Sequence, residues 1–254
     1  MTIRHSISTL LLCLTFSVPA LATQYAVVVT NFGPITVELD DQKAPISVAN
    51  FEQYAKDGFY DNTVFHRVMS GFMIQGGGYD HHGNYPQGLH SKGAHSTTHP
   101  PIANEWKNGL KNVRGSLAMA RLGGQADSAT NEFFINLVDN DFLDQPRDGA
   151  GYAVFGKVVS GMGVVDSIGA MQTTSVGRMA NVPTKEVVIK SVAVFKTMEE
   201  ANTYAAGPRV EAAQRSLADA KAALAVAQAK VEAAQDELDA ATKAVKNEDG
   251  GGTP

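Results

Sequence analysis

Cysteine is nearly absent from this sequence of 254 residues, in which Cys13 is the only one. It lies within the first 22 residues, so the remainder has no thiol for a disulfide, a nucleophile or a zinc site. The Gly-x-Ser-x-Gly motif of α/β-hydrolases and the His-Glu-x-x-His motif of zinc proteases are missing as well. These absences argue against disulfide scaffolds, thiol enzymes and hydrolases of the familiar serine and zinc types.

Positive charge is also in deficit. The 21 Lys and Arg residues face 26 Asp and Glu residues, which gives a net charge of −5. Nucleic acids and anionic membrane surfaces attract clusters of positive charge, so we expect neither as a main partner. The length predicts one domain of ordinary size with an appendage, and no apolar run is long enough for a membrane-spanning helix.

Residues 1–22 have the pattern of an export signal. A short polar start precedes an apolar run at 10–18, and residues 20–22 read Ala-Leu-Ala, the small-x-small pattern that precedes a cleavage site. The alternative is a retained membrane anchor, but the apolar run is too short for one. We therefore predict cleavage after Ala22 and an exported chain that begins at Thr23.

Residues 25–195 read mostly as β-structure. Short apolar or alternating runs are separated by Gly, Asn and Asp clusters, which predicts about eight strands. Two segments, 44–58 and 162–171, have helical spacing instead. Many short strands with two isolated helices favour a mainly β fold, a closed eight-stranded antiparallel barrel with two capping helices.

The composition changes after this region. We expect a linker at 197–208, because Gly207-Pro208 marks a break, then an Ala-rich helix at 209–247 and a flexible tail at 248–254. The helix has a heptad pattern with Val or Leu at position a and Ala at position d. The a positions are Val210, Leu217, Leu224, Val231, Leu238 and Val245, and the d positions are Ala213, Ala220, Ala227, Ala234 and Ala241.

Three interpretations of this heptad helix stay open. It self-associates, or it docks on another partner or on the domain itself, or it is a single solvated helix, since alanine alone favours helix. The e and g positions carry few charges and so name no partner.

Four motifs occur in order along the β region. "FHRVMSGFMIQGGG" (65–78) places Arg67 among apolar residues, and "RGSLAMAR", "ATNEFFINL" and "YAVFGKVVSGMGVVDSI" follow it. Together these motifs resemble the cyclophilins, the peptidyl-prolyl cis–trans isomerases, and most closely their bacterial exported members. The resemblance covers about 24–196, and we expect an isomerase domain at 23–196.

The resemblance implies an enzyme that needs no nucleophile, base, metal or cofactor, because rotation of an X–Pro amide makes and breaks no bond. Amide resonance opposes that rotation with a barrier of about 18–20 kcal/mol. Arg67 matches the family's catalytic arginine. Its permanent cation would stabilise the twisted amide as the prolyl nitrogen becomes pyramidal.

The resemblance also implies the rest of the site. His66 would be structural, Gln75 would hold Arg67 and the substrate backbone, and the segment at Ala120 and Arg121 would bind peptide backbone. The proline pocket would be lined by Phe72, Met73, Phe134 and Leu143.

Four positions depart from the family's usual residues. Glu132 replaces a glutamine, and we hypothesise that it pairs with Arg67 and competes with substrate. Arg121 replaces a small polar residue and is expected to alter peptide preference. Phe142 stands near where many eukaryotic members carry a tryptophan associated with binding cyclosporin, and Tyr152 replaces a histidine in the same wall, so we expect weak inhibition by cyclosporin.

The loop that follows the first motif is rich in histidine, the commonest metal ligand. It lacks helical spacing, cysteine and much acid, so a solvated loop is favoured over a metal site and we assign no metal ligands. Trp106 is expected to be a loop packing residue. The loop histidines are His81, His82, His90, His95 and His99.

The leading prediction is a periplasmic isomerase that helps proline-containing, unfolded or partly folded exported proteins to fold. The periplasm rests on the family resemblance. One alternative is a proline-peptide-binding chaperone or scaffold module with little turnover. Another is an assembly component in which the heptad helix is the working element.

Overall fold

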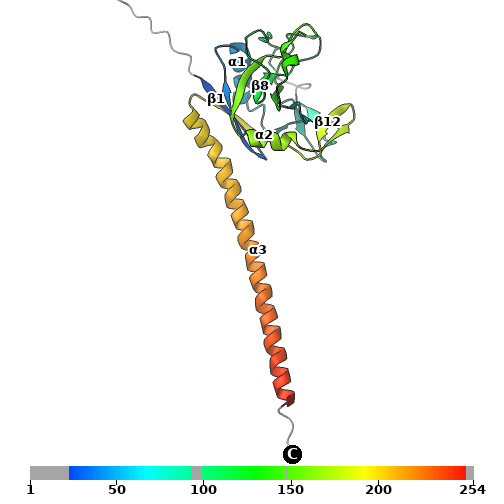
Figure 1. The fold of residues 1–254 in the computed structure, drawn as a ribbon, viewed down its shortest axis with the longest axis vertical. Helices are drawn as coiled ribbons and strands as arrows, with labels where there is room; N and C mark the ends of the chain where they lie inside the picture. The colour runs from blue at the N-terminus through cyan, green and yellow to red at the C-terminus, as the bar shows by residue number, and fades with distance from the viewer. Residues whose placement is uncertain (1–22, 93–98, 147, 250–254) are drawn as a thin grey trace, which may run out of the picture.

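The computed structural model describes residues 23–92, 99–146 and 148–249. Figure 1 shows a β domain from which one long helix, α3, runs away. The predicted signal peptide and residues 250–254 of the predicted tail lie outside the described part. No helix within that part is long and apolar enough to cross a membrane.

Among the described residues, thirteen strands make up the β domain, and every ladder between them is antiparallel. Eleven form one sheet in the order β4-β5-β9-β8-β10-β2-β1-β13-β3-β6-β7, and β11 pairs with β12 separately. The bounds are β1 (Gln24–Thr30), β2 (Gly33–Leu39), β3 (Thr63–Val64), β4 (Arg67–Met69), β5 (Met73–Gly76), β6 (Tyr79–His81), β7 (Leu89–Ser91), β8 (Ser116–Met119), β9 (Phe133–Asn136), β10 (Val154–Ser160), β11 (Thr173–Val176), β12 (Met179–Pro183) and β13 (Val188–Phe195).

The fold is mainly β with a strongly curled antiparallel sheet. The strand order starts at β4 and leads back to β3, its neighbour in sequence, yet no described ladder joins β4 to β7 at the sheet's two ends. The number of strands exceeds the eight predicted from the sequence. One predicted strand is divided into β3 and β4. The four additional strands, β6, β7, β11 and β12, are short and polar or contain Asn and Pro, so they lack the apolar alternation that marks a strand.

Both predicted helices of the domain are confirmed, as α1 (Pro45–Lys56) and α2 (Met162–Gly169). Pro at the first position suits the start of α1, and Gly58, with a φ of 64°, follows its end. Phe51 of α1 packs in the core against Phe133 and Phe155, with ring centroids 5.5 and 5.4 Å apart. The helix therefore covers one side of the curled sheet. A short 3₁₀ helix, η1, spans Asp141–Asp144.

The predicted linker at 197–208 is wrong, because α3 (Met198–Asp249) begins directly after β13. Thr197 and Glu200 form a capping box, in which the Glu200 amide donates to Thr197 Oγ1 and the Thr197 amide donates to Glu200 Oε2, both at 3.2 Å. This box satisfies backbone donors at the helix start.

The first turns of α3 dock on the sheet. Ala201 and Ala205 are buried with Val27 and Val29 of β1. The Tyr204 hydroxyl also lies 2.9 Å from that of a β13 serine. This packing stabilises the helix up to Ala205, and the Ala-rich sequence after Pro208 has high helix propensity. The helix therefore continues through Gly207-Pro208 instead of breaking there.

Candidate active site

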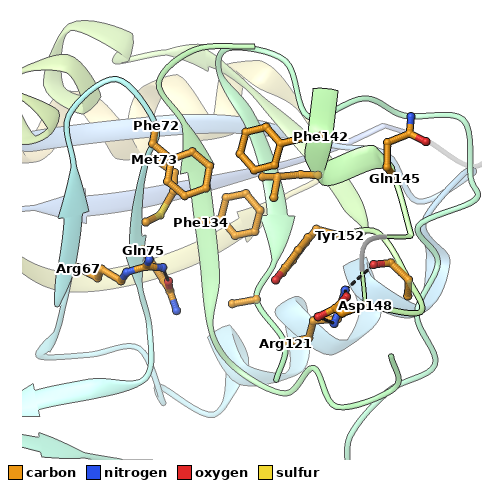
Figure 2. Close-up of a pocket in the computed structure, with 13 residues that line it drawn as sticks. Arg67, Phe72, Met73, Gln75, Arg121, Phe134, Phe142, Gln145, Asp148 and Tyr152 are labelled. Atoms are coloured by element: carbon orange, nitrogen blue, oxygen red, sulfur yellow. Dashed lines mark hydrogen bonds and ion pairs between the residues drawn. The ribbon is translucent and has the colours of Figure 1, made fainter. Parts of the chain in front are cut away.

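A cavity of about 530 Å³ lies on the outer face of the sheet, over β4, β5 and β9 and beside the end of β8. Figure 2 shows aromatic side chains at its centre and Arg67 with Gln75 on one side. Apart from Glu132, every residue that the sequence assigns to the site lines this cavity. The lining consists of Arg67, Phe72, Met73, Gln75, Ala120, Arg121, Phe134, Phe142, Leu143, Gln145, Asp148, Ala150 and Tyr152.

Strand alternation separates the cavity floor from the main core, because successive side chains of a strand point to opposite faces. On β9, Phe133 and Ile135 pack in the main core, while Phe134 belongs to a second cluster that faces the cavity. Met73 of β5 and Leu143 of η1 are buried in the same second cluster. The floor is thus apolar and supported from two strands and a short helix.

Aromatic rings form the walls above this floor. Phe72 stacks on Phe142, with ring centroids 5.5 Å apart and planes inclined by 23°. Phe134 meets Tyr152 edge to face at 5.7 Å. Phe142 nevertheless remains exposed, so the cavity is open to an incoming chain on that side.

Arg67 supplies a positive charge at the rim. It lies opposite Gln75 in the β4–β5 ladder, and its Nη1 donates to Gln75 Oε1 at 3.1 Å. Its Nη2 lies 3.1 Å from Met69 Sδ. The side chain is half-buried, so the guanidinium is held beside the apolar floor without a carboxylate in direct contact among the described residues.

Glu132 does not pair with Arg67 as hypothesised, because Gln75 lies between them. The Gln75 amide Nε2 donates to Glu132 Oε2 at 2.7 Å, while its Oε1 accepts from Arg67. Burial raises the pKa of Glu132, and the hydrogen bond from Gln75 and the charge of Arg67 oppose that rise. The carboxylate therefore fixes which end of the Gln75 amide faces Arg67.

His66 lies beneath this chain of contacts, consistent with a structural role. It is buried, its Nε2 is 3.5 Å from Glu132 Oε2, and its ring centroid is 4.4 Å from that of Tyr79. Burial, assisted by the charge of Arg67, lowers the pKa of His66 to about 3. The ring is therefore neutral near pH 7 and does not add a positive charge beside Arg67.

Arg121 supports the opposite wall. Its guanidinium forms an ion pair with Asp148, its Nε donates to the Gly151 carbonyl at 3.1 Å, and its Cζ lies 4.5 Å from the Tyr152 ring centroid. The Arg121 side chain is only 1% exposed, and the hydrogen bonds of Asp148 to it and to the Gly124 amide lower the pKa of Asp148 to about 2. The arginine thus ties the 148–152 segment to the loop after β8.

Sequence reasoning missed three lining residues, Gln145, Asp148 and Ala150. They lie in the segment between two recognised motifs, where no periodic pattern marks a strand or a helix. The one available signal was the complementary charge of Arg121 and Asp148, which becomes informative only when the fold brings them together.

The loop histidines that the structure describes do not gather into one cluster: His82 and His90 lie together, with ring centroids 5.3 Å apart, whereas His81 and His99 have separate acidic partners. His81 Nδ1 contacts Glu186 Oε1 at 2.8 Å, and His99 Nε2 contacts Asp57 Oδ2 at 2.7 Å. His95 lies outside the described residues. Within the described ranges, no group of three or more His, Cys, Asp or Glu side chains could hold a metal ion.

Trp106 packs against the backbone of the cavity wall, where a Cβ on Gly151 would lie 2.8 Å from its ring. This contact fits the expected packing role. It also makes Trp106 a support for the segment that carries Tyr152.

Comparison with known proteins agrees with this geometry. The family described as "Cyclophilin type peptidyl-prolyl cis-trans isomerase/CLD" matches residues 25–194. Peptidyl-prolyl cis-trans isomerase A of Dickeya dadantii is 48% identical over 188 residues, which are 73% of this chain and 93% of that protein. Peptidyl-prolyl cis-trans isomerase B of Escherichia coli is 49% identical over 168 residues, 65% of this chain and 96% of that protein.

A solved structure gives the same result. The crystal structure of a Cryptosporidium parvum cyclophilin type isomerase matches with a TM-score of 0.53 and 25% identity, covering 68% of this chain and 98% of that one. The matched family region contains every residue that lines the cavity and ends before α3 begins. The chain therefore belongs to the cyclophilin family of peptidyl-prolyl cis–trans isomerases, which are enzymes.

Proposed function

We propose that this isomerase accelerates rotation about X–Pro bonds in exported proteins, with Arg67 as the catalytic residue. The observation that carries the proposal is the placement of one fixed cation beside a buried apolar floor. A proline ring is apolar and would lie on Met73, Phe134 and Leu143. The prolyl nitrogen would then face the Arg67 side of the cavity.

Charge placement explains how such a site lowers the barrier. In a planar amide the nitrogen lone pair is delocalised into the carbonyl, whereas in the twisted amide it is localised on nitrogen. A hydrogen-bond donor with a permanent charge interacts more strongly with the localised pair, so it stabilises the transition state more than the ground state. The bonds of Arg67 to Gln75 and of Gln75 to Glu132 keep the donor in place before the substrate arrives.

Arg67→Ala tests the catalytic role. We expect exchange NMR on a short Ala-Pro peptide to show cis–trans exchange slowed by about 10²–10³-fold, the usual effect of removing one such donor. Lys190→Ala is the matched control, because it removes a positive charge from an exposed position on β13, away from the cavity. Retained fast exchange in Arg67→Ala would rule out this mechanism.

The alternative function is a proline-peptide-binding module with little turnover. The exposed Phe142 and the open cavity favour this alternative, because both features suit the binding of an extended chain. The same NMR experiment separates the two, because a binding module would show peptide line broadening without accelerated exchange in the unmodified protein.

We also propose export to the periplasm, with removal of residues 1–22. The support is the signal pattern of this segment, the absence of cysteine after it, and the bacterial origin of close relatives. The proposed substrates are proline-containing exported proteins that are unfolded or partly folded. N-terminal sequencing of the protein from a periplasmic fraction should begin at Thr23, and an intact Met1 would contradict cleavage.

Finally, we infer that the curled sheet is a closed eight-stranded barrel. Only Phe65 and His66 separate β3 from β4, so the two can be counted as one bent strand. The series β4, β5, β9, β8, β10, β2, β1 and β13 then returns to its own first member through β3. Fast hydrogen exchange along β4, as at a free sheet edge, would contradict closure.

A further inference from the structure

An apolar stripe on α3 has no partner in the described part of the chain. Val210, Leu217, Leu224 and Val231 are 53, 56, 58 and 70% exposed. The buried residues that α3 contributes there are Ala201 and Ala205, both in its first turns. In Figure 1 the rest of the helix runs away from the β domain, so the domain does not cover the stripe.

The spacing of this stripe indicates a helical partner. Its large residues recur every seven positions, and an isolated helix of 3.6 residues per turn would let such a stripe drift around its axis. A strict seven-residue repeat stays on one face only when two helices wind around each other. Three positions after Leu217, Leu224 and Val231 come alanines, at 220, 227 and 234, which are exposed as well.

The alternation of large and small residues makes the stripe complementary to itself. In an antiparallel pair of copies, Leu224 faces Ala227 of the partner subunit, and the same alignment sets Leu217 against Ala234 of the partner subunit and Val231 against Ala220 of the partner subunit. Every layer then holds one large and one small side chain. A parallel pair alternates two large with two small residues, which leaves uneven gaps that close packing disfavours.

The charges beside the stripe agree with this alignment. Lys221 and Lys230 flank it and are exposed. In the alignment above, Lys230 lies near Ala223 of the partner subunit and Lys221 near Gln228 of the partner subunit. Shifting the pair by one heptad sets Lys230 against its own copy in one direction and Lys221 against its own copy in the other, and such like-charge contacts are unfavourable.

We propose that the chain forms an antiparallel homodimer through α3. Along the helix axis, the midpoint of the paired segment lies at the level between Ala225 and Val226. The occupant of the stripe is a second copy of this chain. The two isomerase domains then lie at opposite ends of the paired helices. This inference does not depend on the proposed catalytic role of Arg67, since no cavity residue takes part.

Light scattering on residues 23–254, which include every described element, tests the dimer. We expect twice the monomer mass for the unmodified chain and for Val226→Glu, and the monomer mass for Leu224→Glu. Leu224 and Val226 are matched, because each is 58% exposed on the same helix and only Leu224 lies on the stripe. A monomeric or a higher oligomeric unmodified chain, or equal effects of the two variants, would overturn the proposal.

Cysteine cross-linking tests the orientation. The chain from Thr23 has no cysteine, so Leu217→Cys and Ala234→Cys each introduce a single thiol. We expect a disulfide-linked dimer only when the two variants are mixed. Disulfides within either variant alone, or none in the mixture, would overturn the antiparallel alignment. Circular dichroism and isomerase activity would confirm that each variant is folded.

Discussion

At the scale of single residues, the site depends on how one amide is oriented. Gln75 is bonded through its oxygen to Arg67 and through its nitrogen to Glu132. An amide can turn by 180° unless its neighbours distinguish its two ends. A carboxylate only accepts and a guanidinium only donates, so this pair of neighbours permits one orientation.

Glu132→Gln is predicted to change stability more than activity. The new amide can still accept from Gln75, so we expect kcat/KM within about threefold of the unmodified value. The change also removes a charge that is half-buried beside His66 and Tyr79, so we expect a gain of roughly 1 kcal/mol in unfolding free energy at pH 7.

The gain in unfolding free energy in Glu132→Gln is expected to depend on pH. Because burial raises the pKa of Glu132, the folded state holds the proton at higher pH than the unfolded state does. Stability of the unmodified protein therefore falls as pH rises from the ordinary glutamate pKa through the raised one. Urea unfolding across this range should show the advantage of Glu132→Gln growing toward neutral pH. Glu38→Gln, at an exposed position on β2, should show no such trend. A large gain of kcat/KM in Glu132→Gln would restore the hypothesis of direct competition, because the change would remove the competitor.

Most of the cavity was predictable from the sequence at this scale, because Arg67, Phe72 and Phe134 stand within ordered motifs. The direct pairing of Glu132 with Arg67 was not, because a motif gives positions along the chain and not which side chain lies between two others. The role of Arg121 failed to emerge for the same reason, since its partner Asp148 lies 27 positions away.

At the scale of elements, α1 and α2 followed from spacing and turn residues, whereas the start of α3 did not. The pair Gly207-Pro208 suggested a break, but the capping box at Thr197 and Glu200 was a local signal of equal weight. The burial of Ala201 on β1 decided between the two. Tertiary packing thus overrode a helix-breaking residue whose cost in a helix interior is about 3 kcal/mol.

Thr197→Ala is predicted to loosen the docking of α3 without affecting the β core. Loss of the capping side chain should cost about 1 kcal/mol at the start of the helix. Hydrogen exchange should therefore quicken at residues 198–206, with strands β8 and β9 unchanged. Thr203→Ala is the control, because Thr203 Oγ1 bonds a carbonyl within the helix instead of capping its start. Equal exchange in the two variants would show that the box does not stabilise this junction.

At the scale of the whole molecule, catalysis and the heptad segment are separable. Every cavity residue lies between 67 and 152, and the family match ends at 194. A chain ending at Ala206 keeps the buried Ala201 and Ala205, so we predict full isomerase activity and unchanged stability. A chain ending at Lys196 exposes the patch around Val27 and Val29, so it should be less stable and prone to aggregate. Activity assays and thermal melts check both, and loss of activity in the longer truncated form would show that the helix contributes to the site.

Because α3 follows β13 directly and docks on the sheet, the far end of the helix is held at a fixed distance from the isomerase domain. A helix of 52 residues is about 78 Å long at roughly 1.5 Å per residue, and its docked start leaves the isomerase domain no hinge about which to fold back. A polypeptide attached near the far end of the helix must span that length to reach the cavity, which takes roughly 22 fully extended residues at about 3.5 Å each. Prolines closer to such an attachment point stay out of reach of the cavity of the same chain. In the proposed antiparallel dimer they lie instead at the end of the paired helices that carries the isomerase domain of the partner subunit.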